Sequence, residues 1–369
     1  MQHRAIAQRL LAFAGITCNG ANEWDIQVHD DRFYRRALLE GSVGFGESYM
    51  DGWWTCARMD LCIERILRSG LADWVPQFDE IKMKLRNLFR DRQSKEGSLR
   101  VAREHYDLSP DFFINILGDT NSYTCGRWPG VSTLDAAQVQ KMDQLCRKLV
   151  LRQGQTVLDI GCGWGGFAGY AATKYGVNGI GQSISSVQLE YARSRYGDLP
   201  IKFLDQDYRD FRGKADAAVS ICMIEHIGPA HYVEYFQRVR DALPKDGLFA
   251  LQCIIAHRKR DMSSAWSDKY IFPGGMLVTL KNLRKSIRGI FHILDEEYFG
   301  EDYVLTLRAW LNNLRINKDA IVRKYGIEHY RKYEFYFLSF IGSFLSERIT
   351  VGQFVLSATP RPGYVPIRL

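Results

Sequence analysis

A carboxylate and an imidazole stand side by side at the end of an apolar run. The run reads SICMIEHIGP, so Glu225 and His226 follow a strand-like segment and precede the break at Gly228 and Pro229. Burying a charge is costly, and a carboxylate at the mouth of an apolar strand needs a specific partner. The pair therefore marks a candidate functional site.

A second chemical signal is the glycine-rich run VLDIGCGWGG. Gly161 and Gly163 let the backbone approach a ligand closely where a strand meets a helix. With Gly166 they fit the dinucleotide fingerprint, but the next strand ends at Gln182 without the acid that a nicotinamide site needs. The form D-x-G-x-G, which starts at Asp159, resembles the first motif of class I methyltransferases, which bind S-adenosylmethionine. A structural turn without a ligand is the third alternative.

Both signals lie within a regular alternation of short apolar strands and helices. This pattern is typical of a parallel sheet covered on both faces. We therefore expect an α/β fold with a Rossmann-like sheet. Its strands are expected at 156–160, 179–182, 201–207, 216–223, 247–255 and 352–359, and its helices at 165–175, 186–196, 230–243 and 334–347.

The rest of the chain predicts two further parts. Residues 1–95 are expected to form a smaller, mainly helical domain, and residues 96–369 the catalytic domain with an inserted cap at about 256–325. Within the first domain we expect helices at 33–39 and 59–70, the second ending at Gly70, and a glycine-rich loop at 40–54.

The overall composition is that of an ordinary globular protein. The chain has 369 residues, and 49 Lys and Arg against 42 Asp and Glu give a net charge of +7, which permits an anionic partner. Its eight cysteines form no C-x-x-C pair, so we expect no metal site. Neither a signal peptide nor a membrane-spanning segment is evident. These features predict a reduced, cytoplasmic protein.

Several further motifs occur together and in order along the chain. With them the sequence resembles the cyclopropane-fatty-acyl-phospholipid synthase family of methyltransferases. The matching runs are GESYMDGWW, HYDLSPDFF, SYTCGRW, VLDIGCGWGG, QDYRD, MIEHIGP, KYIFPGG and FGEDYVLTLRAW.

The resemblance implies a reaction and two bound small molecules. A methylene group passes from S-adenosylmethionine to the cis double bond of an unsaturated phospholipid acyl chain. A cyclopropane ring then forms through a carbocation that a bound bicarbonate ion deprotonates. The protein must orient the alkene, exclude water and hold the base.

The resemblance also implies roles for individual residues. Cys125, Glu225 and Tyr303 would hold the bicarbonate, with the backbone near Ile254. His226 is expected to be a structural partner in the same turn, with a catalytic role as the alternative. Residues implied in cofactor binding are Tyr123, Thr124, Asp159, Gly161, Gly163, Gly165, Ser183, Ser185, Gln188, Gln206, Asp207 and Tyr208. Ser186 is also a plausible helix N-cap.

One departure from the family pattern affects this site. Where the family has a histidine on the fifth strand, this chain has Gln252. An amide can donate a hydrogen bond but cannot titrate, so anion binding could persist while proton handling changes. A second departure is Val278 in place of a proline, for which we expect an effect on loop stiffness only.

Access to an acyl chain suggests contact with a membrane. The basic helix at 82–92 and the cluster at 257–260 could dock on anionic headgroups, although both could equally be solvated surface. The resemblance implies a homodimer located in the cytoplasm and held peripherally at the inner membrane. No nucleic-acid partner is expected, because the N/D-P-P-Y/F motif of amino-methyltransferases is replaced by MIEHIGP.

Two alternative functions stay open. One is a lipid C-methyltransferase that gives a methyl-branched or methylene fatty acid without closing a ring, which the Gln252 substitution suggests. The other is an inactive lipid-binding homologue.

Overall fold

The computed structural model describes residues 2–74, 110–257 and 264–369. The chain divides into two compact units. Unit 1 combines Met1–Asp91, Ser263–Pro273 and Tyr303–Ile349, and unit 2 combines Arg92–Met262, Gly274–Asp302 and Thr350–Leu369. The domain boundary expected at residue 95 lies outside the described residues. Unit 1 also takes a later segment, 303–349, which we expected in the catalytic domain.

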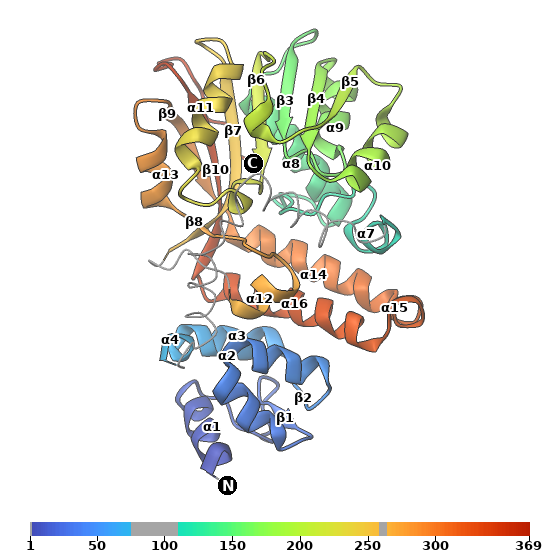
Figure 1. Ribbon diagram of the computed structural model, residues 1–369, viewed down its shortest axis with the longest axis vertical. Coiled ribbons are helices and arrows are strands. Elements are labelled where there is room, and N and C mark those ends of the chain that lie inside the picture. Colours follow the sequence, from blue (N-terminus) through green and yellow to red (C-terminus); the bar gives the residue numbers. More distant parts are fainter. Residues whose placement is uncertain (1, 75–109, 258–263) are drawn as a thin grey trace. The chain divides into compact units, whose positions relative to one another are not determined.

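Unit 2 is built around one sheet with the strand order β5-β4-β3-β6-β7-β10-β9, and β8 pairs with β7 (Figure 1). The strands from β5 to β7 are parallel to one another, whereas β9 and β10 are antiparallel. The predicted α/β fold is confirmed. The strands are β3 (Thr156–Ile160), β4 (Asn178–Ser183), β5 (Ile201–Asp205), β6 (Ala217–Ile221), β7 (Leu248–Ala256), β8 (Val278–Thr279), β9 (His292–Tyr298) and β10 (Ile349–Ser357).

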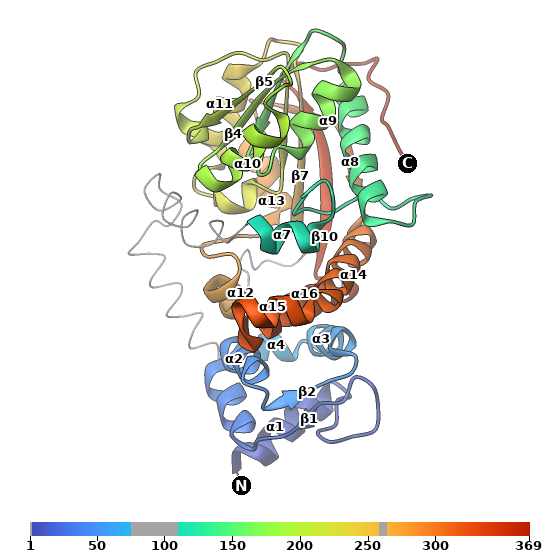
Figure 2. The same ribbon diagram turned by 90° about the vertical axis from the view of Figure 1, so that its right-hand side faces the viewer.

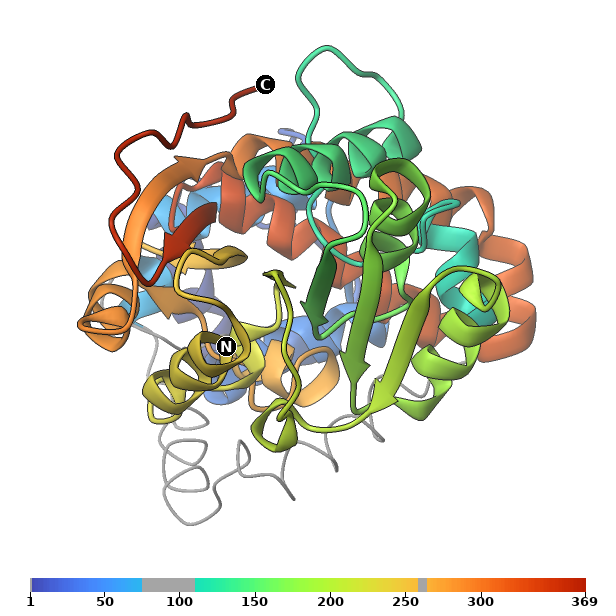
Figure 3. The same ribbon diagram turned by 90° about the horizontal axis from the view of Figure 1, so that it is seen from above.

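Helices cover both faces of this sheet because successive strand residues point to opposite sides. Val157 packs in a core with α8 (Leu134–Lys148) and α9 (Gly166–Tyr175), while Leu158 packs in another with α11 (Tyr232–Ala242) and α13 (Leu280–Ile287). Figure 2 shows α8 and α9 opposite α11, and Figure 3 shows these layers from above. The other helical elements of unit 2 are α7 (Pro110–Leu117), α10 (Ser186–Tyr196), η1 (Tyr208–Asp210) and η2 (Ile224–His226).

The segment expected as an inserted cap, 256–325, is divided between the two units. Strands β8 and β9 extend the sheet of unit 2, and α13 belongs to its core. Strand β9 has the sequence HILDEEY, whose acidic residues suggest a solvated segment rather than a strand. Asp295 and Glu297 can be buried there because Lys148 and Arg127 pair with them.

Unit 1 is mainly helical, and aromatic side chains form much of its core. The rings of Trp266 and Phe335 lie 4.6 Å apart, and those of Phe45 and Trp54 lie 4.5 Å apart. This packing explains why residues 303–349 belong to unit 1. Its elements are α1 (Gln2–Phe13), β1 (Gln27–Val28), α2 (Arg32–Met50), β2 (Trp54–Thr55), α3 (Met59–Arg68), α4 (Leu71–Trp74), α12 (Ala265–Tyr270), α15 (Lys318–Tyr325), α16 (Ile327–Leu345) and most of α14 (Gly300–Ile316).

The glycine-rich segment 40–54 is helical as far as Met50, so the predicted loop is wrong there. Helix α2 kinks at Gly41, which has a φ of 55°, and then continues. Gly46 packs on the indole of Trp266, and a Cβ atom at this position would lie 2.4 Å from Cδ1 of that ring. The glycine therefore serves close helix packing rather than a turn.

The second predicted helix of unit 1 is confirmed, since α3 ends at Arg68 and Gly70 follows with a φ of 78°. Within the described ranges, no helix combines the length and the apolar character needed to cross a membrane.

Candidate active site

The carboxyl ends of β5, β4, β3, β6 and β7 meet at one edge of the sheet because these strands are parallel neighbours. The segments after them carry most of the predicted site residues: the glycine-rich turn after β3, Ser183 at the end of β4, Gln206 after β5 and Glu225 after β6. Strand order reverses between β3 and β6. Open α/β sheets bind ligands at such a switch point.

The glycine-rich turn is shaped by its backbone. Gly161 has a φ of 78°, and a Cβ atom there would lie 2.6 Å from Cγ of Met223. Gly163 has a φ of 52°, and the position of its missing Cβ atom borders open space. The Gly161 N–H donates to the Gln182 carbonyl at 2.9 Å, and Gly165 is the N-cap residue of α9. The open space over Gly163 suits close approach of a nucleotide-like ligand.

The segment between β4 and α10 is stabilised by its own hydroxyl groups. The Ser185 hydroxyl accepts the Gln188 N–H at 3.4 Å and caps α10, so the cap is one residue earlier than the expected Ser186. The Ser185 N–H in turn donates to the Ser183 hydroxyl at 3.2 Å, and the Gln206 N–H donates to the Ser183 carbonyl at 3.1 Å. Contacts of these residues with a cofactor stay predictions.

The segment after β5 carries Asp207 and Tyr208. Arg209 donates to the Asp207 carboxylate from Nε at 2.7 Å and from an η nitrogen at 2.8 Å. The Tyr208 ring packs edge-on against Tyr235, with centroids 5.3 Å apart. Asp207 therefore has a structural role as the cap of η1, and a role beside adenine stays a prediction.

Asp159 lies buried at the end of β3. Burial raises the pKa of its carboxyl to about 7, and the Lys141 ammonium and the Ala168 N–H oppose this rise. The Oδ2 atom has no hydrogen-bond partner among the described residues. A buried acceptor without a partner, beside a turn that borders open space, fits a ligand with a donor group.

Cys125 is fully buried, and the segment around it is held mainly by α8. Gln138 donates from Nε2 to the Thr124 carbonyl at 2.8 Å, and Lys141 donates from Nζ to the Thr124 hydroxyl at 2.8 Å. From the sheet, Gln252 donates from Nε2 to the Cys125 carbonyl at 3.4 Å. The structure thus brings Cys125 and Gln252 together. Tyr123, in the same segment, packs against Phe113.

Glu225 is buried in η2, and its carboxylate is directed at β7. Its Oε1 atom accepts the Ile254 N–H at 2.7 Å. Burial raises the pKa of Glu225 to about 7, against the lowering effects of the Ile254 N–H and the nearby Cys222 thiol. Glu225 is therefore fixed two residues along β7 from Gln252. A joint role of Glu225 and the Ile254 backbone in holding bicarbonate stays a prediction.

Two further residues of the predicted catalytic set are His226 and Tyr303. Burial lowers the pKa of His226 to about 4, so its imidazole is neutral at pH 7 and accepts a proton weakly. Tyr303 lies in unit 1, where its ring packs against Phe344 at 4.8 Å and Trp310 at 5.9 Å. Convergence of Tyr303 with Cys125 and Glu225 stays a prediction.

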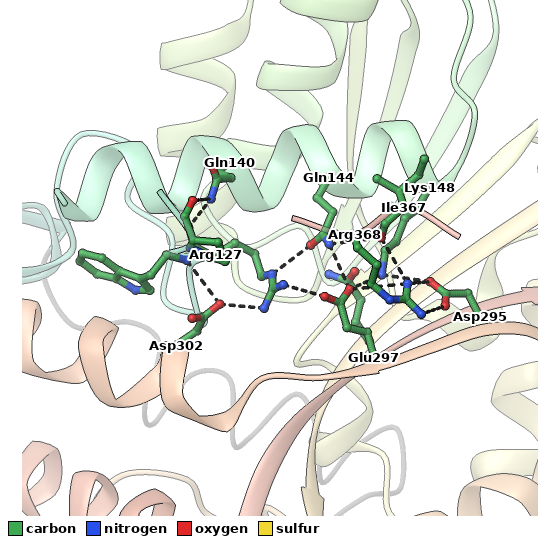
Figure 4. A network of polar contacts seen from close by, with 12 residues as sticks. Arg127, Gln140, Gln144, Lys148, Asp295, Glu297, Asp302, Ile367 and Arg368 are labelled. Carbon is green, nitrogen blue, oxygen red and sulfur yellow. Dashed lines mark hydrogen bonds and ion pairs between the residues drawn. The ribbon is translucent and has the colours of Figure 1, made fainter. Parts of the chain in front are cut away.

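A buried ionic network anchors the same segment to β9 (Figure 4). Arg127, two residues after Cys125, pairs with Glu297 at 2.7 Å and with Asp302 at 2.7 Å. Lys148 of α8 also pairs with Glu297, at 2.7 Å. Asp295 and Arg368, whose side chain is half-exposed, complete the network, so that three cations face three carboxylates. Such matching is needed to bury charges.

Five residues near the site escaped the sequence prediction. Lys141, Gln138 and Arg127 hold the Cys125 segment, Cys222 lies beside Glu225, and Gln353 contacts Gln252. On α8 the residues Gln138, Lys141, Gln144 and Lys148 form one buried polar face, at most 1% exposed. Their spacing is that of a solvated helix face, so the sequence offered no signal for their burial.

Comparison with known proteins identifies the family. The model of the family described as mycolic acid cyclopropane synthetase matches residues 93–354. The chain belongs to this family. The chain is also 39% identical to the cyclopropane-fatty-acyl-phospholipid synthase of Escherichia coli (strain K12), over 95% of this chain and 92% of that protein. The predicted family and its enzymatic nature as an S-adenosylmethionine-dependent methyltransferase are confirmed.

Other known proteins are also similar to this chain. A sphingolipid C9-methyltransferase of Candida albicans is 32% identical over 95% of this chain and 70% of its own length. The solved structure of the cyclopropane synthase MmaA2 from Mycobacterium tuberculosis has a TM-score of 0.67 at 28% identity, over 70% of this chain and 98% of that one. The mycolic acid cyclopropane synthase CmaA1, solved with SAH and CTAB, matches to the same extent.

Proposed function

We propose that the protein transfers a methylene group from S-adenosylmethionine to the cis double bond of an unsaturated phospholipid acyl chain and closes a cyclopropane ring. The observation that carries this proposal is the 39% identity to the Escherichia coli synthase across 95% of the chain. The strand-end arrangement of Glu225, Gln252 and Cys125 supports it.

The turn after β3 fits the cofactor. The open space at Gly163 admits the nucleotide part, and the partnerless Oδ2 atom of Asp159 would accept from its amino-acid end. The residues that would hold the rest are Tyr123, Thr124, Gly161, Gly165, Ser183, Ser185, Gln188, Gln206, Asp207 and Tyr208. S-adenosylmethionine supplies an electrophilic methyl group, and bicarbonate supplies a base for the proton that leaves before ring closure.

The protein's own groups would fix the base and exclude water. Gln252 presents an N–H on the side of Cys125, and Glu225 is held by Ile254. Because its pKa is about 7, Glu225 can carry a proton at neutral pH and share it with an anion. Tyr303 would complete the set, and His226, neutral at pH 7, is a structural residue of the turn.

A lipid substrate implies that the protein works at a membrane surface. We propose a homodimer in the cytoplasm that contacts the inner membrane peripherally. His257 is exposed at the end of β7. The rest of the basic cluster at 257–260 and the basic helix at 82–92 lie outside the described residues.

Methylation without ring closure is the second candidate. Gln252 cannot titrate, and the chain is 32% identical to a sphingolipid C9-methyltransferase.

One experiment separates these candidates. Purified protein is incubated with S-adenosylmethionine and vesicles of phosphatidylglycerol that carries cis-monounsaturated chains, and the products are analysed by mass spectrometry after transesterification. We expect a product acyl chain that is heavier by one CH2, contains no double bond and resists mild hydrogenation. A methyl-branched or methylene product instead would establish the second candidate, and absence of turnover on these vesicles would contradict the proposed substrate. Gln252→His, run in parallel, tests whether this residue sets the outcome.

A further inference from the structure

Two buried glutamines on neighbouring strands of the sheet contact each other. Gln252 on β7 and Gln353 on the neighbouring strand β10 are both 0% exposed. Gln353 donates from Nε2 to the Gln252 Oε1 atom at 3.1 Å, and Gln252 donates from Nε2 to the Cys125 carbonyl at 3.4 Å. The two amides therefore form a continuous row that ends at the Cys125 backbone.

The direction of this row follows from the chemistry of its end. The oxygen and nitrogen of an amide can exchange places by rotation, so the orientation must follow from the partners. A backbone carbonyl can only accept, and therefore Gln252 must turn its nitrogen toward Cys125. Its oxygen then faces β10, and Gln353 must present a nitrogen to it. The Cys125 carbonyl and the Gln353 donor thus act together to fix the orientation of the Gln252 amide.

This arrangement fixes what Gln252 offers to a ligand. Its oxygen is occupied by Gln353, and one of its two N–H groups points to Cys125. The second N–H has no acceptor among the described residues. An amide that presents only an N–H donor attracts an anion, whereas an amide that presented its carbonyl oxygen at the same place would repel the anion.

We propose that Gln353 is a positioning residue that locks the amide of Gln252 with its nitrogen on the Cys125 side, so that its remaining N–H binds the anionic base. This rests on the proposed function, which places bicarbonate there. Without the donor of Gln353, the Gln252 oxygen loses its partner and only the longer bond to the Cys125 carbonyl, at 3.4 Å, holds the amide. The amide can then rotate and present its oxygen to the anion. Gln353 itself need not touch the ligand.

The test compares Gln353→Met, Gln252→Met and the double variant. Methionine has a similar volume and no donor, so packing is largely kept. We expect Gln353→Met to raise the bicarbonate concentration for half-maximal rate about tenfold, which is 1.4 kcal/mol. Its kcat and its affinity for S-adenosylhomocysteine should change less than twofold. The double variant should lose no more than Gln252→Met alone, because Gln353 acts through Gln252.

A spectroscopic readout is independent of turnover. With glutamine labelled by 15N, sodium bicarbonate should shift the side-chain amide signals of Gln252, assigned through their loss in Gln252→Met, and Gln353→Met should abolish this shift. Additive losses in the double variant, or a shift retained in Gln353→Met, would overturn the positioning role. A wild-type rate that does not depend on bicarbonate would instead overturn the proposed base.

Discussion

Cys222 offers a sharp test of the geometry around Glu225. It follows β6 with a φ of 52°, in the left-handed region that side chains with a Cβ atom disfavour. Its N–H donates to the Gln252 carbonyl at 2.7 Å, which holds this conformation in place. The perturbation is a set of three substitutions: Cys222→Gly relieves backbone strain, Cys222→Ala retains it, and Cys222→Ser retains a donor.

The expected difference follows from opposing terms. Left-handed backbone costs a residue with a Cβ atom roughly 1–2 kcal/mol. Glycine avoids this cost but loses about 0.5–1 kcal/mol more backbone entropy on folding than alanine. Both variants lose the same thiol, so its burial largely cancels. Cys222→Gly should therefore be more stable than Cys222→Ala by about 0.5–1 kcal/mol.

Urea denaturation with matched slopes measures this difference. Cys253, buried on β7 and absent from the residues with positive φ, provides the control. There glycine should be less stable than alanine, since strand interiors disfavour it. If glycine is also the less stable variant at position 222, the left-handed backbone carries no strain and our reasoning fails. Enzymatic activity is a second measurement. Cys222→Ser should retain more activity than Cys222→Ala, because the hydroxyl can still donate to Glu225.

Three further predictions concern buried charges. Burial raises the pKa of Glu225 from 4.5 to about 7, so between these pH values the folded protein retains a proton that the unfolded chain releases, and stability falls as pH rises through this range. The stability of Glu225→Gln relative to the wild type, measured by urea denaturation, should therefore increase from pH 5 to pH 8. A constant difference would contradict this. Glu297→Gln should cost about 3–5 kcal/mol in the same assay because it leaves three cations of the network facing only two carboxylates. Glu296→Gln, whose Arg284 partner is 55% exposed, should cost under about 1 kcal/mol. Equal losses would show that the network is not specifically stabilising. Lys141→Met should weaken S-adenosylhomocysteine binding about tenfold in calorimetry, because the Thr124 hydroxyl loses its donor. Lys174→Met, on the exposed face of α9, should leave this binding unchanged. Unchanged binding in Lys141→Met would exclude a positioning role for Lys141.

The sequence predicted those parts of the fold whose pattern is local. Strands β3 to β7 are short apolar runs next to helices, and both the Gly161 turn and the Glu225 turn follow strand ends where we expected them. Strand β9 and the helical course of α2 were not predicted. The acids of β9 are buried only because distant cations match them, and Gly46 fits in a helix only because Trp266 packs on it.

In the candidate site too, residues within local motifs could be predicted, whereas residues that depend on distant partners could not. Motif residues such as Cys125, Glu225 and Gln252 could be selected from the sequence with the family resemblance. Residues that act through these could not. Gln353 belongs to no motif, and its role depends on a partner 101 positions away in the sequence. Lys141 looks like any surface lysine until the Thr124 segment covers it.

The buried polar face of α8 has a consequence for how unit 2 folds. In the unfolded chain Gln138, Lys141, Gln144 and Lys148 are solvated by water, and an early helix packed on the sheet would have to desolvate them without partners. Their partners come from Thr124 and from Glu297 on β9, which are far apart in the sequence. Docking of α8 should therefore belong to the last step of folding. In the native protein, its amide hydrogens should exchange together with those of β9 as one cooperative unit.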